Sequence, residues 1–160
     1  MTGPQMRRTG PIDLIVPFGI IGVTAYVLLR TSYSELPPLG YFVPVPLAVM
    51  GIVELVIARR VRAAVRHVAY AKPMTAIAIA RCVALGKASS LVGAAVAGAT
   101  VALLARVIPE AGDVRAAAND TKVGVLLLAS TILVTAAGIL LERAGIDPNR
   151  DRREYDDRRN

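Results

Sequence analysis

The chain has 160 residues, which is enough for one domain, and 54% of them are hydrophobic, with a mean hydropathy of +0.53. This composition is more apolar than that of an ordinary soluble domain. In a soluble protein the net charge of +7 and the pI near 10.2 would suggest nucleic-acid binding. In so apolar a chain we instead expect Lys and Arg to gather in the cytoplasmic loops of a membrane protein.

The N-terminal part predicts a flexible arm over residues 1–10 and a first membrane span over 12–29. The span is interrupted only by Asp13 and Thr24, and it is long enough to cross hydrocarbon as a helix. Two arginines precede it, so a signal peptide is the alternative. The run is long for a signal core, however, and only a weak cleavage pattern follows Arg30, so we predict a retained span.

The second apolar run predicts a helix that starts at its prolines and continues beyond the membrane. Pro44 and Pro46 place the start near residues 43–45. The span 43–58 then reaches Arg59, and helical spacing of apolar residues continues past it. We therefore predict a basic cytoplasmic hairpin over residues 59–85.

The third predicted span, 86–107, carries rows of small residues at helical spacing. Such rows let membrane helices approach closely. An Ala-rich helix also produces them by chance. We interpret the row as a helix-packing face consisting of Ser89, Gly93, Ala97 and Gly98.

A polar loop over residues 109–122 precedes the fourth predicted span, 123–141, and Asn119, Asp120 and Thr121 offer N-caps for that span. The tail 146–160 is a mixture of Arg and Asp with almost nothing to bury, which predicts disorder. The expected fold is therefore all-α: one transmembrane four-helix bundle over residues 11–145.

The distribution of basic residues predicts the orientation. The arm, the hairpin and the tail hold most of the Lys and Arg, whereas the opposite segments hold Arg30, Arg106, Arg115 and Lys122. With four spans, both termini lie on one side, and the positive-inside rule makes it the cytoplasmic side.

Glu54 is the one acid well inside a predicted span. An ionisable group there costs ~2.5 kcal/mol or more near the span centre, so a partner is expected. If the second and third helices form an antiparallel hairpin, Glu54 lies level with about Ser89, and Lys87 and Ser90 lie within one turn of it. We predict an intramembrane pair of Glu54 with Lys87, supported by Ser89 or Ser90. The pair could be a structural clamp or a proton or ion site; alternatively, both groups reach the surface separately.

No acid occurs between Glu54 and Glu110, so the hairpin's cations are uncompensated. Ordinary topology explains such a cluster, and so does a docking surface for an acidic partner or anionic lipid headgroups. The predicted docking surface consists of Arg59, Arg60, Arg62, Arg66, Lys72 and Arg81.

The sequence offers no recognisable catalytic, cofactor or metal motif. Residues 85–90 resemble the end of a phosphate-binding loop, but Arg81 stands where that loop needs glycine. His67 is the only histidine, Cys82 is expected to pack, and Asp113 with Asp120 would form a pair only by coincidence. We expect no enzyme, no cofactor, no metal and no nucleic-acid partner.

Several stretches together resemble a known family: SELPPLGYFVP with AVMGIVELVIARRVR, AIARCVALGKASSLVGAAVAG, and NDTKVGVLLLASTILVTAAGILLERAG. They are similar to an uncharacterised actinobacterial family of four-span membrane proteins, a domain of unknown function encoded beside folate-biosynthesis genes. The resemblance covers roughly residues 10–145 and implies the cell inner membrane but no activity. The pattern from Arg81 to Ser89 is its most specific part, and Glu54 and Glu142 also match.

These observations predict a non-enzymatic, partner-binding or accessory membrane protein that docks through its basic hairpin. Membrane lipids, a protein partner or a second copy of the chain are the expected partners. The alternative is a small oligomeric transporter or channel subunit that uses Glu54 and Lys87.

Overall fold

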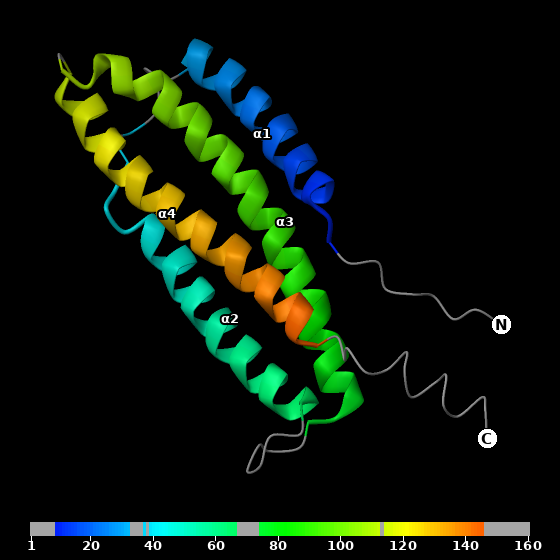
Figure 1. Ribbon diagram of the computed structural model, residues 1–160. Coiled ribbons are helices and arrows are strands. Elements are labelled where there is room, and N and C mark those ends of the chain that lie inside the picture. Colours follow the sequence, from blue (N-terminus) through cyan, green and yellow to red (C-terminus); the bar gives the residue numbers. More distant parts are fainter. Residues whose placement is uncertain (1–8, 33–36, 38, 67–73, 113, 146–160) are drawn as a thin grey trace, which may run out of the picture.

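The computed structural model describes residues 9–32, 37, 39–66, 74–112 and 114–145. Within these ranges the fold is all-α, with no strand. Its elements are α1 (Pro11–Ser32), α2 (Pro44–Val65), α3 (Ala76–Val107), the short 3-10 helix η2 (Ile108–Glu110) and α4 (Arg115–Ala144). The four long helices run alternately up and down in an elongated bundle (Figure 1).

The helices do not lie side by side in chain order. α3 packs against both α1 and α4, and α4 also packs against α2, so the spatial order is α1, α3, α4, α2 (Figure 1). α2 and α3 are consecutive in the chain but share few contacts, because α4 lies alongside both of them. The sequence predicted that α2 and α3 pack side by side as a hairpin. In the structure α4 separates them along most of their length.

Two close crossings between glycines hold α3 at the centre of the bundle. A Cβ added to Gly86 would lie 2.6 Å from the carbonyl oxygen of Gly138 on α4. A Cβ added to Gly98 would collide with the backbone of Phe18 on α1, and one added to Gly22 would lie 3.2 Å from the Gly98 carbonyl oxygen. Side chains as small as hydrogen are required at both crossings, a requirement that closely packed membrane helices also have.

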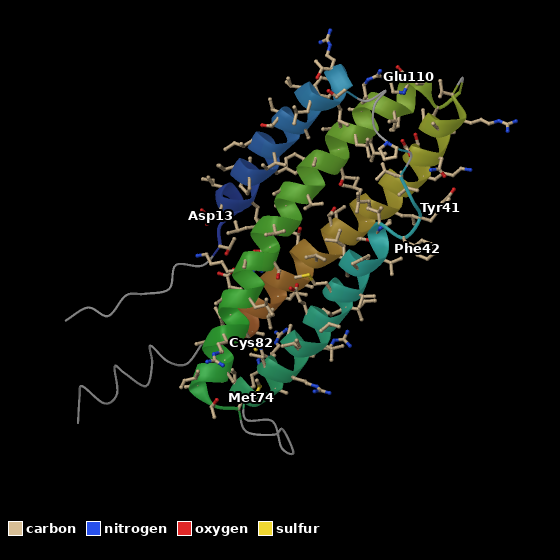
Figure 2. All side chains as sticks on the ribbon, turned by 180° about the vertical axis from the view of Figure 1, so that it is seen from behind. Asp13, Tyr41, Phe42, Met74, Cys82 and Glu110 are labelled. Carbon is tan, nitrogen blue, oxygen red and sulfur yellow. The ribbon has the colours of Figure 1, made fainter. Side chains whose placement is uncertain are left out.

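The bundle has two distinct ends. At the proximal end, a buried cluster joins the end of α2 to the end of α4 (Ala58, Val61, Leu141 and Ala144). Met74, just before α3, and Cys82, in its first turns, pack against this cluster (Figure 2). The backbone N–H of Thr9, just before α1, donates to Glu142 Oε1 at 2.7 Å, so the start of α1 belongs to this end as well. The distal end contains a second cluster, consisting of Leu103, Val107 and Ala117.

The helices are longer than the predicted spans. α4 begins at Arg115 and not near residue 123, because the alanines at positions 116–118 already favour a helix. Asn119 and Asp120 consequently lie inside α4, so their prediction as N-caps is wrong. α3 begins at Ala76, where Thr75 is the N-cap residue and its side chain accepts a hydrogen bond from the Ala78 N–H.

Three helical segments are long and apolar enough to cross a membrane: α1, residues Ala76–Glu110, and α4. α2 is also 22 residues long but lacks a sufficiently uncharged window, because it contains Glu54, Arg59, Arg60 and Arg62. Length and composition thus support three of the four expected spans. Residues 1–8 of the predicted arm, the predicted turn with His67 and Lys72, and the tail 146–160 lie outside the described residues.

Candidate functional site

The basic side chains of the predicted docking surface gather at the proximal end. Those of Arg59, Arg60, Arg62 and Arg66, at the end of α2, and of Arg81, near the start of α3, are all exposed. Lys72 lies outside the described residues. The structure adds Arg143, an exposed residue in the last turn of α4 that the sequence analysis did not include.

Among the described residues, no exposed carboxylate lies at this end. Asp13 accepts the Gly10 N–H at 2.8 Å, and the other two acids of this half, Glu54 and Glu142, are buried. The six exposed arginines therefore form a surface of one sign, which we call the basic end: Arg59, Arg60, Arg62, Arg66, Arg81 and Arg143.

The distal end balances its charges differently. Arg106 forms an ion pair with Glu110 one turn later. Asp120 is only 3% exposed, and its carboxylate accepts the backbone N–H of Leu39 at 2.8 Å, while Asn119 Nδ2 donates to the Leu39 carbonyl at 3.0 Å. This polar clamp fastens the chain before α2 to the first turns of α4. From the sequence, Asn119 and Asp120 were predicted only as N-caps of the fourth span. Their contacts with Leu39 were not predicted.

Glu54 is 2% exposed and lies on the face of α2 that turns into the bundle. The polar side chain that faces its carboxylate is Ser89 of α3, as the residue count along the hairpin predicted. Yet neither Glu54 oxygen, nor Ser89 Oγ, has a hydrogen-bond partner among the described residues. Glu54 is therefore a buried acid without a compensating donor.

Neither Glu54 oxygen accepts a hydrogen bond from Lys87, and the Ser90 hydroxyl bonds within α3; the charge pair of Glu54 with Lys87 otherwise stays a prediction. Ser90 Oγ donates to the Lys87 carbonyl at 2.9 Å, within α3, and Ser90 is fully buried where Gly138 of α4 approaches its backbone. The physical reason is the position of α4. Because α4 lies alongside both α2 and α3, these two helices share few contacts, and one of the places where they meet is Glu54 with Ser89.

Glu142 is a second buried acid, 4% exposed, one turn beyond the crossing of α3 and α4. Its Oε1 accepts the Thr9 N–H, whereas its Oε2 has no partner in the described part of the chain. The sequence marked Glu142 only as a residue near the end of the fourth span. Its contact with Thr9, 133 positions earlier, is visible only in the structure.

The four residues of the predicted helix-packing face are all buried, but against three different neighbouring helices. Ser89 faces Glu54 of α2, and a Cβ on Gly93 would meet Thr135 of α4. Gly98 touches Phe18 of α1, and Ala97 is buried alongside it. These contacts occupy the small-residue face within the chain itself.

The described residues contain no group of three or more His, Cys, Asp or Glu side chains that could hold a metal ion. Cys82 is half-buried against the proximal cluster. What the structure does bring together is a surface of six exposed arginines and, about one helical turn deeper into the bundle, a buried acid whose two oxygens have no hydrogen-bond partner among the described residues.

Comparison with curated proteins found no match, and comparison with solved structures found none either. The model of one protein family, described as a protein of unknown function (DUF3180), matches residues 14–148. This match covers all four helices except the first three residues of α1. The chain therefore belongs to the DUF3180 family, an uncharacterised domain family.

Proposed function

We propose that this chain is a non-enzymatic integral membrane protein of the cell inner membrane that docks an acidic partner through its basic end. In this proposal both termini and the basic end face the cytoplasm. The observation that carries it is the set of six exposed arginines at the proximal end, where the described residues show no exposed carboxylate.

Membrane insertion is supported by the side chains that the bundle leaves outside. None of the residues of α1 is buried, and large apolar side chains such as Ile12, Val23 and Leu28 are more than half exposed. So large an apolar exterior is unfavourable in water and normal in lipid. α2 lies beside α4 over its whole length, which favours a fourth crossing whose arginines emerge on the cytoplasmic side (Figure 1).

Membrane topology alone could explain the arginines of the basic end. The arrangement of the helices at that end supports docking in addition. α3 extends past the start of α1, so its first turns lie beyond α1 and near the end of α2 (Figure 1). Arginines held on the ends of helices form a firm surface for carboxylates or phosphates, which the guanidinium group binds in bidentate fashion. Near an anionic surface each such charge contributes about 1 kcal/mol of attraction.

The test is purification of the tagged protein from its own membrane in mild detergent, followed by mass spectrometry. We expect a stoichiometric partner with the wild type, and its loss when Arg59, Arg60, Arg62 and Arg66 are changed to Gln. The matched control changes Arg30, Arg115 and Lys122, which are exposed at the distal end, to Gln and should keep the partner. A homo-oligomer without any partner, identical in both variants, would refute docking.

The second candidate, a small oligomeric transporter or channel subunit, is favoured by one observation: Glu54 is a buried acid whose two oxygens have no hydrogen-bond partner among the described residues. Intramembrane acids often mark ion pathways. A pathway through both Glu54 and Lys87 is less well supported, because the two do not form a hydrogen-bonded pair. Proteoliposome flux that is lost in Glu54→Gln would favour this candidate over docking.

A further inference from the structure

Glu54 is surrounded by groups that suit a neutral carboxyl better than a charged one. A carboxylate has room for about four hydrogen bonds, and Ser89, the polar side chain of the described residues that faces it, supplies a single donor. A protonated carboxyl carries its own O–H, which Ser89 Oγ can accept, while the Ser89 O–H serves the second oxygen. Both groups are now unpartnered and are 2% and 3% exposed, so one proton would satisfy two orphaned side chains.

The elements packed around Glu54 offer no compensating charge at hydrogen-bonding distance. On α2, the neighbouring turns present Gly51 and Ala58. On α4, Leu133 and Val134 approach Gly51, and the buried acid of that helix's last turn, Glu142, accepts the Thr9 N–H. On α3, Lys87 is half-buried, and neither Glu54 oxygen bonds to it. A charged carboxylate in such a setting is very costly, whereas a proton removes the charge entirely.

A metal cation fits this site less well than a proton. Hard cations take several oxygen ligands, usually six or more for Ca²⁺. The described residues place one carboxylate and one hydroxyl here, and no cluster of three acids exists among them.

We propose that Glu54 and Ser89 form a proton-binding site that holds α2 against α3 and α4. A proton from cytoplasmic water adds to one carboxylate oxygen of Glu54, and the new O–H donates to Ser89 Oγ. When the O–H bond breaks, the proton returns to water. The charged side chain then favours hydration, which loosens α2 from its neighbours.

Protonation of Glu54 would affect function through the position of α2. α2 carries Arg59, Arg60 and Arg62, with Arg66 directly after it, so its attachment controls how firmly most of the basic end is held. This consequence rests on the proposed docking function, whereas proton binding itself does not.

Infrared spectroscopy of the whole protein in nanodiscs of ether-linked phosphatidylcholine, which has no ester C=O group of its own, tests the proposal. At pH 7 an exposed glutamate, with a pKa of about 4.3, is ionised and gives no carboxylic-acid C=O band. We expect such a band in the wild type and its absence in Glu54→Gln. Ser89→Ala should keep the band but shift it to higher frequency, because it loses a hydrogen bond, and Glu142→Gln should leave it unchanged.

Absence of the band in the wild type, or its persistence in Glu54→Gln, would overturn the proposal. Should Glu54→Gln fail to fold, the shift in Ser89→Ala decides, and an unshifted band there counts against the site. A band seen in choline buffer but removed by sodium would identify a bound cation and reject the proton. A carboxylic-acid band in a wild type that purifies without a partner would support proton binding and refute docking. A partner that is lost in the arginine variant, together with no band in the wild type, would support docking and refute proton binding.

Discussion

The two ends of the bundle treat buried polar groups in opposite ways. At the distal end, Asp120 is buried but accepts the Leu39 N–H, and Asn119 holds the same residue by its carbonyl. At the proximal end, Glu54, Ser89, Glu142 and Thr9 each keep at least one buried oxygen without a partner among the described residues. Satisfied buried groups stabilise a fold, and unsatisfied ones cost about 1–3 kcal/mol each. The buried polar groups of the distal end therefore stabilise the fold. Those of the proximal end, where we propose the functional site, reduce its stability.

The largest expected loss of folded protein comes from blocking the close crossing of α3 and α4 at Gly86 and Gly138. Gly138→Leu would force a side chain into space where even a Cβ lies 2.6 Å from the Gly86 carbonyl. We expect loss of monodisperse protein in size-exclusion chromatography, because α3 and α4 cannot approach. Gly19→Leu is the control: nothing lies within 4 Å of a Cβ there, and this variant should elute like the wild type.

A smaller loss should follow from breaking the distal clamp. Asp120→Ala leaves the Leu39 N–H without its acceptor, which should reduce the free energy of unfolding by about 1–3 kcal/mol. In a thermal unfolding experiment in detergent, this loss of stability should appear as a lower midpoint temperature for Asp120→Ala than for the wild type. An unchanged midpoint would show that the clamp contributes nothing and would remove the contrast between the ends.

Removing the ionisable group of the buried acid at the proximal end should behave differently. Glu54→Gln keeps the size and shape of the side chain, removes its ability to ionise and replaces one oxygen by an amide NH2. Since no cation pairs with Glu54 by a hydrogen bond, we expect the unfolding midpoint at pH 7 to stay the same or to rise. A fall as large as that of Asp120→Ala would mean that the Glu54 carboxylate is as well compensated as the distal acid.

The smallest effect is expected for the exposed pair at the distal end. Arg106 and Glu110 are one turn apart and partly open to solvent, with side chains 29% and 41% exposed. Such pairs contribute about 0.3–0.5 kcal/mol and are screened by salt. Glu110→Gln should therefore lower the unfolding midpoint slightly in low salt and not at all in high salt. A salt-independent loss would indicate a role beyond the ion pair.

The helices themselves were predictable, whereas the contacts of their polar residues were not. The prolines at positions 44 and 46 correctly located the start of α2, and the uncharged runs identified α1 and the core of α3. The start of α4 was placed too late because Asn119 and Asp120 are typical capping residues. Their side chains instead hold Leu39, some 80 positions away, and no local pattern reveals such a partner.

The sequence by itself determined the all-α fold, the apolar character and the concentration of arginines around the end of α2, because these depend on composition and local periodicity. It also placed Ser89 level with Glu54, because antiparallel helices joined by a turn advance equally along the bundle axis. Only the tertiary structure decided which helices touch. Because glycines at positions 86 and 138 let α3 and α4 meet backbone to backbone, α4 lies alongside both α2 and α3 and leaves Glu54 facing Ser89 without a hydrogen bond to Lys87.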